Sequence, residues 1–466
     1  MRIRILGHYV HRATAALALL EMGVVAVAML VAIFLRLGDQ LGDLQAHLGP
    51  LSPRMVLFGF VMTVSLLAFG MYSSRQRAPA FGIAVRVVAA VCAGTAVTTF
   101  FFYLLPSLWL GRGVMLLAAL IALAGLGASR YVFMRVVDDE AFKRRVLVYG
   151  CGQHAASIAR LRRRADRRGF VVVGYAQADG ELGAVPADQL ISSSVRLDRY
   201  CQEHDVDEVV VAMEDRRRAF PLLELLECRL AGIDVTELLT FLERETGRVR
   251  IDVLNPSWMI FGEGFRRDGL RLVSSRAVDL LASLAILLVS LPAMLATACA
   301  IKLEEGWKAP VLYRQSRVGL GGQPFEVLKF RSMRMDAELD GRAQWAQKSD
   351  PRVTRVGAII RKLRIDELPQ ILNVIRGHMS VVGPRPERPH FVAELADRIP
   401  YYVQRHCVKP GITGWAQLCY PYGSSEQDAV EKLQYDLYYI KNNSLLFDLA
   451  IIVQTAEVVI MGKGAR

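Results

Sequence analysis

Four long apolar runs occupy the first third of the chain and predict membrane-spanning helices. Each run comes close to the ~20 residues that an α-helix needs to cross about 30 Å of hydrocarbon. The runs are Ala15–Leu35, Met55–Tyr72, Ile83–Leu105 and Val114–Phe133. The first run is too long for the core of a cleaved signal peptide, so we expect it to remain as an anchor. Residues 1–140 are therefore predicted to form a four-helix transmembrane domain.

The distribution of Lys and Arg gives this domain an orientation. Basic residues gather before the first run, between the second and the third, and after the fourth. The other two loops carry fewer of them, together with Asp39 and Asp43. Because cytoplasmic loops of membrane proteins hold the excess of Lys and Arg, we expect both ends of the four-helix domain to face the cytoplasm.

After about Arg145 the pattern changes to short β-branched runs that alternate with helix-like stretches. The predicted strands are Val146–Tyr149, Phe170–Tyr175, Asp207–Met213 and Ile233–Thr236. Strands that alternate with helices are typical of a parallel sheet in an α/β domain. We expect a Rossmann-like α/β domain over residues 141–254 and a linker over residues 255–273.

A fifth apolar run, Ala277–Ile301, has basic residues on both flanks and Pro292 near its middle. Proline removes a backbone donor and clashes with the carbonyl of Leu288, so we expect a kink. A simple crossing would place one basic flank outside the cytoplasm, against the usual charge bias. A re-entrant helix, which enters one leaflet and returns, avoids this, but a kinked spanning helix also fits the residues.

Residues 274–466, which include this run, are predicted to form an α+β catalytic domain. Beyond the run the sequence is mixed, basic and rich in turns that contain glycine and proline. The last apolar stretch, Leu445–Met461, contains Asp448 and Glu457. Charges at that spacing favour an amphipathic helix over a membrane span.

The overall composition excludes several classes of protein and site. Hydrophobic residues make up 53% of the chain and charged residues 22%, which excludes a disordered chain. The net charge of +12 suits cytoplasmic loops beside anionic lipid, or an anionic substrate. No nucleic-acid recognition motif accompanies this charge, so we expect no nucleic-acid partner. The seven Cys form no CxxC and the eight His no HExxH, which argues against a zinc site and a disulfide framework.

Two adjacent carboxylates, Asp366 and Glu367, are the strongest candidates for chemistry. They follow a cluster of cations, Arg361, Lys362 and Arg364, which should lower the pKa of Asp366 and attract a phosphate. Adjacent carboxylates can hold Mg²⁺ together with substrate phosphates, and a carboxylate can itself attack phosphorus. The pattern therefore indicates phosphoryl transfer. The alternative is a solvated helix end with i,i+4 ion pairs.

Two other motifs place cations where a phosphate could bind. Lys329 and Arg331 follow a predicted strand at period two, so both should point to one face and suit a diphosphate. Arg385 lies between two prolines that restrict its backbone and preorganise its guanidinium. The alternatives are an edge strand with protective charges and a rigid turn. Trp415, in a glycine-rich turn, is a candidate for the membrane interface.

Taken together, the motifs resemble those of the bacterial polyprenyl-phosphate hexose-1-phosphate transferases, the monotopic phosphoglycosyl transferases. The matching pieces are YRQSRVG from Tyr313, KFRSM from Lys329, DELPQ from Asp366, GPRP from Gly383 and PGITGWAQ from Pro410. They lie between about Arg276 and Gly462. The helices and the α/β domain in front resemble the large, exopolysaccharide-type members, such as undecaprenyl-phosphate glucose phosphotransferases.

The resemblance implies a reaction and a site. UDP-hexose and undecaprenyl phosphate would give undecaprenyl-diphosphate-hexose and UMP, with glucose as the expected hexose and galactose next. Asp366 would attack the sugar-linked phosphate and form a covalent phosphosugar intermediate, while Asp366 and Glu367 would position Mg²⁺. The residues implied to contact phosphate or nucleotide are Lys329, Arg331, Arg361 and Arg385.

The resemblance also implies a location and a helix break. It places the chain in the bacterial inner (cytoplasmic) membrane, with the catalytic domain on the cytoplasmic face, and suggests a homodimer through the α/β domain. The family has a re-entrant helix broken at a Ser-Pro pair. Here Pro292 matches the proline, but Leu291 precedes it and the serine is Ser290. The resemblance favours a re-entrant helix near residues 277–301.

A weaker motif, Gly150-Cys151-Gly152-Gln153-His154-Ala155, fits the dinucleotide pattern G-x-G-x-x-A between a strand and a helix. No acid ends the next strand to bind a ribose, and Asp179 comes only later. We therefore expect a degenerate, structural or regulatory domain. Two other functions stay open: a membrane-anchored sugar-nucleotide oxidoreductase or dehydratase that uses this domain, and a non-catalytic scaffold of a polysaccharide export machine.

Overall fold

The computed structural model divides into two compact units, Met1–Thr246 and Gly247–Arg466, and each is described by itself. The residues that the structure describes are 2–5, 8–38, 51–69, 71, 80–137, 143–161, 166, 169–178, 181, 183–192, 195–215, 220–254, 256–261, 269–334, 352–420, 423 and 425–460.

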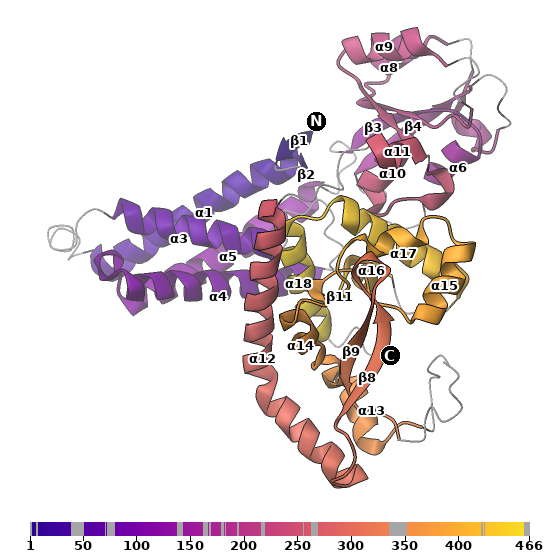
Figure 1. Cartoon of the computed structure of the whole chain (residues 1–466). Helices are drawn as coiled ribbons and strands as arrows, with labels where there is room; N and C mark the ends of the chain where they lie inside the picture. Colours follow the sequence, from indigo (N-terminus) through magenta and orange to yellow (C-terminus); the bar gives the residue numbers. More distant parts are fainter. Residues whose placement is uncertain are drawn as a thin grey trace. The chain divides into compact units, whose positions relative to one another are not determined.

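The apolar runs of the first unit form helices, as predicted. They are α1 (Arg12–Leu37), α3 (Ser52–Ala68), α4 (Ala80–Leu104) and α5 (Arg112–Val137), after a short antiparallel hairpin of β1 (Arg2–Ile5) and β2 (His8–His11) (Figure 1). By length and composition α1, α4 and α5 can each cross a membrane. Helix α3 has 17 residues, about 26 Å at 1.5 Å per residue, which is slightly short of the hydrocarbon thickness.

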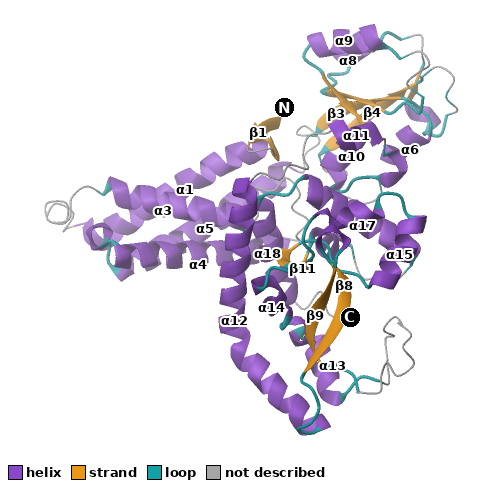
Figure 2. Ribbon diagram, viewed as in Figure 1, coloured by secondary structure: helices purple, strands orange, loops and turns teal. Residues whose placement is uncertain are grey.

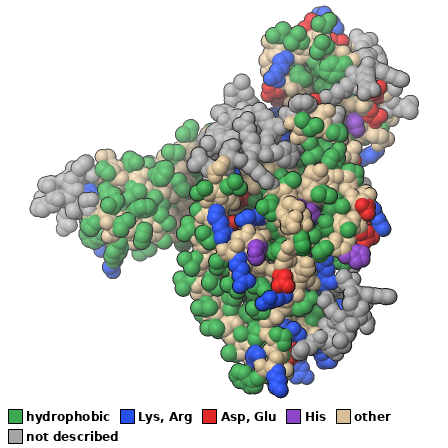
Figure 3. Space-filling model, viewed as in Figure 1, with side chains coloured by type: hydrophobic (Ala, Val, Ile, Leu, Met, Phe, Trp, Pro, Cys, Tyr) green, Lys and Arg blue, Asp and Glu red, His purple; other side chains and the backbone are tan. Residues whose placement is uncertain are grey.

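The bundle buries several charged residues inside its apolar core, while many other apolar side chains are exposed on its outside. Glu21 of α1 and Arg130 of α5 form an ion pair at 2.6 Å, and both are almost fully buried. Arg86 is also buried. The visible outer face of the bundle consists mainly of hydrophobic side chains (Figure 3). A solvent of lipid rather than water explains this arrangement, because charges inside a membrane face the bundle interior and pair there.

Residues 143–246 contain the predicted parallel α/β sheet. Its strands are β3 (Arg144–Tyr149), β4 (Phe170–Ala176), β5 (Leu190–Ile191), β6 (Glu208–Val211) and β7 (Asp234–Glu237), all parallel, in the order β5-β4-β3-β6-β7. The helices are α6 (Gln153–Ala159), α8 (Leu197–Glu203), α9 (Leu222–Leu230) and α10 (Leu238–Thr246). Helices α8 and α9 lie on one face of the sheet and α6 and α10 on the other (Figure 2). The order of strands reverses between β3 and β6.

The second unit is the expected mixture of helices and short strands. Its strands form an antiparallel hairpin, β8 (Leu312–Val318) with β9 (Pro324–Phe330), and a parallel pair, β10 (Ser380–Val382) with β11 (Gly411–Thr413). The helices are α11 (Pro256–Phe261), α12 (Gly269–Glu305), α13 (Arg355–Lys362), α14 (Gln370–Ile375), α15 (Pro389–Arg398), α16 (Trp415–Cys419), α17 (Glu426–Lys441) and α18 (Leu445–Ile460).

The first residues of the second unit are bound to its core. Trp415 is buried and its indole Nε1 donates to the carbonyl of Gly247 at 2.8 Å. The amide of Val249 donates to the carbonyl of Gln434 at 3.0 Å. The expectation that Trp415 lies at a membrane interface is therefore wrong, because its polar atom pairs inside the unit. Residues 255–273, predicted as a linker, include α11 and the first turn of α12.

Helix α12 is one helix of 37 residues with Pro292 inside it, and it changes direction along its length (Figure 1). Near its start, Arg276 donates to the carbonyls of Val374 and Ile375, both at 2.6 Å. At its end, the Glu304 carboxylate accepts from the first two amides of α13, each at 2.9 Å. Both ends of α12 are thus bound to the same unit. Several apolar side chains between them are 41–82% exposed: Leu280, Leu281, Leu284, Leu288, Val289, Leu291 and Leu295.

Candidate active site

Asp366 and Glu367 lie at a sharp corner between two helices. Thr354 caps α13 by accepting from the amide of Gly357 at 2.9 Å. Helix α13 ends at Lys362, and Arg364 then takes a left-handed conformation with φ of 60°. A single 3₁₀ turn, Ile365–Glu367, presents the two acids. Pro369 is the residue before α14, where its fixed φ suits the start of a helix.

Glu367 brings together two of the predicted cationic motifs. Arg385, from the turn after β10, donates to Glu367 Oε1 at 2.6 Å, and Lys329, from β9, donates to the same oxygen at 3.3 Å. The three side chains are only 13–25% exposed. Burial alone would raise the pKa of Glu367, but Arg385 and Lys329 outweigh it and hold this pKa well below its usual range. Glu367 is therefore an anion at neutral pH.

Asp366 has a different environment from its neighbour. Its Oδ1 is buried and accepts no hydrogen bond from any residue that the structure describes. Burial and the adjacent charge of Glu367 raise the pKa of Asp366, and the opposing charges of Lys329, Arg364 and Arg361 do not cancel them. The cations lower this pKa, as predicted, but the expectation of a net lowering was wrong, because it left out burial and the charge of Glu367.

The four predicted phosphate contacts are not equivalent. Lys329 and Arg385 bind Glu367, and Arg361, in the last turn of α13, acts on Asp366 through its charge. Arg331 lies beyond the end of β9, and its Nε donates to the carbonyl of Pro310 at 3.0 Å. The structure therefore brings three of these cations to the acidic pair and ties the fourth to the backbone.

A buried network that the sequence did not reveal holds the turn of Arg385. Arg405 is 6% exposed and donates to Asp436 at 2.8 Å, to the hydroxyl of Tyr402 at 2.7 Å and to the carbonyl of Arg385 at 3.0 Å. Gly383 precedes this turn, and a Cβ there would collide with the backbone at Lys409. These residues fix the backbone from which the Arg385 guanidinium reaches Glu367.

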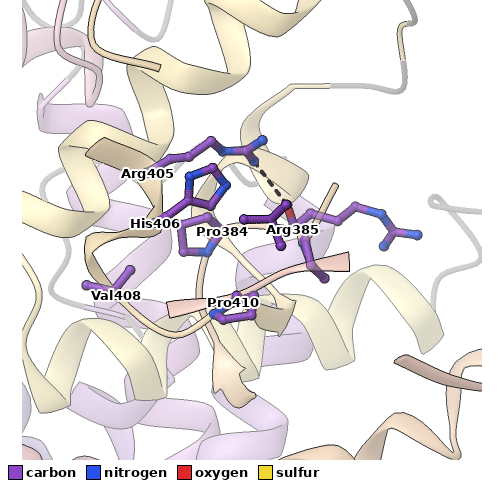
Figure 4. A pocket seen from close by; sticks show the side chains of 9 residues that line it. Pro384, Arg385, Arg405, His406, Val408 and Pro410 are labelled. Atoms are coloured by element: carbon purple, nitrogen blue, oxygen red, sulfur yellow. Dashed lines mark hydrogen bonds between the residues drawn. The ribbon is translucent and has the colours of Figure 1, made fainter. Parts of the chain in front are cut away.

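A small pocket lies beside the same turn, and Figure 4 shows it from close by. The Arg385 side chain points away from Arg405 and His406, while Arg405 donates to the backbone carbonyl of Arg385. The residues that line the pocket are Val318, Gly319, Pro384, Arg385, Pro386, Arg405, His406, Val408 and Pro410.

The acidic pair fits a divalent cation. Mg²⁺ is typically held by one or two carboxylates together with substrate phosphates. The buried Asp366 Oδ1, which accepts no hydrogen bond from the described residues, offers one oxygen ligand. In Glu367 both cations bind Oε1, which leaves Oε2 as a second candidate. Among the described residues no group of three or more His, Cys, Asp or Glu could hold a metal.

The other predicted site residues, Ser290, Pro292, Gly150 and Gly152, belong to α12 and to the α/β domain. Ser290 donates to the sulfur of Met294 at 3.5 Å, and Pro292 lies inside α12. Gly150 follows β3 with φ of 125°, a conformation that favours glycine. Gly152 is the residue before α6.

Two family models match the chain, one over most of the second unit and one over part of the helical bundle and of the α/β domain. The family model "Bacterial sugar transferase" matches residues 270–462, and the model "CoA-binding domain" matches residues 67–233.

Several characterised relatives are similar over longer stretches. An Aeromonas hydrophila UDP-N-acetylgalactosamine-undecaprenyl-phosphate N-acetylgalactosaminephosphotransferase is 45% identical over 52% of the chain and 56% of its own length. A Xanthomonas campestris UDP-glucose:undecaprenyl-phosphate glucose-1-phosphate transferase is 34% identical over 69% of the chain and 67% of its own length. A Komagataeibacter xylinus undecaprenyl-phosphate glucose phosphotransferase is 33% identical over 72% of the chain and 62% of its own length.

Proposed function

Since this chain belongs to the bacterial sugar transferase family, the polyprenyl-phosphate hexose-1-phosphate transferases, we propose that it transfers hexose-1-phosphate from a UDP-sugar to undecaprenyl phosphate. UMP is the other product. This step would start the assembly of an exopolysaccharide. The observation on which the proposal chiefly rests is the meeting of Lys329 and Arg385 at Glu367, directly beside a buried Asp366 oxygen that accepts no hydrogen bond from the described residues.

The proposed chemistry has two displacement steps at one phosphorus atom. An Asp366 oxygen attacks the phosphorus that bears the sugar, the bond to the bridging oxygen breaks, and UMP leaves with that oxygen. A phosphate oxygen of undecaprenyl phosphate then attacks the same phosphorus and expels the Asp366 carboxylate. Mg²⁺, held by Asp366 and Glu367, would supply charge neutralisation to the substrate phosphates.

The cations around the pair have separate parts in this chemistry. Lys329 and Arg385 keep Glu367 ionised. Arg361 and Arg364 add positive charge near Asp366, where negative charge develops on the transferred phosphate.

We propose that α12 is re-entrant and that the catalytic unit lies at the cytoplasmic face of the inner membrane. The contacts of Arg276 and Glu304 support this, because they bind both ends of α12 to one unit. At 1.5 Å per residue the helix is about 55 Å long, so a bend lets its exposed apolar middle enter one leaflet and return. A homodimer stays a prediction from the family resemblance.

Labelled sugar nucleotides test the proposed activity. Membranes that contain the protein are incubated with Mg²⁺ and radiolabelled UDP-glucose, UDP-galactose or UDP-N-acetylgalactosamine, and lipid-extractable label and UMP are counted. The relatives' names divide between glucose and N-acetylgalactosamine, and glucose stays our prediction for this chain. Label in lipid with none of these sugars, or the same yield from Asp366→Asn, would leave a scaffold or an oxidoreductase as the better hypothesis.

A further inference from the structure

The α/β domain has a feature that the transferase chemistry does not use, namely the glycine loop, residues 150–152. The loop follows β3, and the order of strands reverses between β3 and β6. In open α/β sheets the crevice at such a reversal is where nucleotides bind, with the diphosphate on the amides of the glycine loop. Glu214 follows β6 and therefore lies on the other side of this crevice.

Two carboxylates of the chain itself bind the amides of this loop. Glu181 Oε2 accepts from the amides of Cys151 at 2.7 Å and Gly152 at 3.1 Å. Glu181 Oε1 accepts from the amide of Glu214 at 2.7 Å. The Glu214 carboxylate in turn accepts from the amide of Gln153. Four backbone amides that face the crevice are thus bonded to carboxylate oxygens.

The Glu214 carboxylate lies close against the glycine loop. A Cβ at Gly152 would clash with a Glu214 carboxylate oxygen, so a side chain here would require this carboxylate to move. The amide of Ala184 also donates to the carbonyl of Cys151 at 2.7 Å, which fixes the chain near Glu181 against the loop.

We propose that Glu181 and Glu214 take the place of a nucleotide diphosphate, and that the native α/β domain therefore binds neither CoA nor a dinucleotide. The residues present thus disagree with the description of the family model that matches residues 67–233. A diphosphate would have to displace both carboxylates from four amides and would lie beside two like charges, and like-charge contacts are an effective means of excluding a ligand. This inference does not depend on the transferase activity.

Removal of the two carboxylates tests the proposal. The full-length protein in detergent is dialysed against radiolabelled CoA or ADP, and bound label is counted for the wild type and for E181A/E214A. We expect the wild type to show no saturable binding up to 1 mM ligand, which is on the order of the weakest affinity that such dialysis resolves. The double variant should bind with a dissociation constant at least about tenfold below this limit. The matched control is E203A/E227A, since both of these glutamates are more than half exposed in the same domain; it should behave as the wild type.

Saturable binding of CoA or ADP by the wild type, or no gain in the double variant, would overturn the proposal. If the double variant does not fold, amide hydrogen exchange of the wild type, measured with and without CoA, still tests the proposal. The amides of Cys151, Gly152 and Gln153 should be protected to the same extent with and without CoA. Protection that increases when CoA is added would show that these amides are available to a ligand.

Discussion

Replacement of Arg385 by Met removes the shorter of the two contacts that hold Glu367 as an anion. The Arg385–Glu367 contact is 2.6 Å long, and the two side chains are 25% and 13% exposed. Lys329 stays at 3.3 Å in the variant, so Glu367 is not left without a cation. The loss should therefore be about 2 kcal/mol, within the range for a hydrogen bond to a charged group and below that for a fully unpaired buried charge.

This free energy gives two measurable results. If the pair also orders the site during transfer, about 2 kcal/mol corresponds to a loss of roughly 30-fold in kcat/KM. The thermal unfolding midpoint at pH 7 should fall by about 4 to 8 °C, given 2–4 °C for each kcal/mol in a unit of this size. Arg314→Met is the matched control, because Arg314 and Glu326 form a 3.3 Å pair in the same unit but are 70% and 61% exposed. The control should change stability by less than about 1 kcal/mol.

The dependence on pH identifies Glu367 as the origin of the effect. Its pKa in the folded protein lies below the value of about 4.3 in the unfolded chain. The stability that its ionisation contributes is therefore complete above that value and is lost as the pH falls further. Glu367 titrates alike in the two unfolded chains, so the difference between the wild type and Arg385→Met should stay constant from pH 7 to about pH 5 and shrink only as the pH falls below the pKa of Glu367 in the folded variant. A difference that is already lost at about pH 5, or full activity of the variant, would be inconsistent with Glu367 as its origin.

Three further outcomes follow from the same site. Glu367→Gln should lower the transfer rate and move the acid limb of the pH–rate profile to lower pH, because the charge of Glu367 contributes to the raised pKa of Asp366; an unchanged limb contradicts this. Removal of divalent cations with EDTA should abolish transfer and Mg²⁺ should restore it; transfer that survives EDTA contradicts the proposed metal. In a cysteine-free background, single cysteines at Val273 and Trp307, which are 70% and 80% exposed near the two ends of α12, should both react with a reagent applied from the cytoplasmic side, whereas a spanning helix would protect one of them.

Local patterns in the sequence predicted much of the fold. Apolar runs gave the helices of the bundle, and alternating β-branched runs gave the parallel sheet, because both patterns depend on the period of the element alone. The sequence motifs also identified Asp366, Glu367, Lys329 and Arg385 as candidate site residues, and the structure brings these four together. The corner at Arg364 was not predicted, since a left-handed arginine has no local sequence signal.

Properties that depend on tertiary contacts were not predicted. The raised pKa of Asp366 comes chiefly from burial, whereas the sequence shows only the neighbouring cations, which lower it. The network of Arg405 and Asp436 joins residues 31 positions apart, and neither belongs to a motif. Glu181 lies about 30 residues beyond the glycine loop that it fills, so its role appears only when the loop is folded.

Peptide mapping can show whether Asp366 becomes covalently linked to the sugar phosphate. The protein is mixed with a UDP-sugar labelled with ³²P in the sugar-linked phosphate, without undecaprenyl phosphate, and is then denatured and digested. We expect one labelled peptide that contains Asp366, equimolar release of UMP, and no label in Asp366→Asn. Label on another residue, or release of UMP by Asp366→Asn at the wild-type rate, would contradict it.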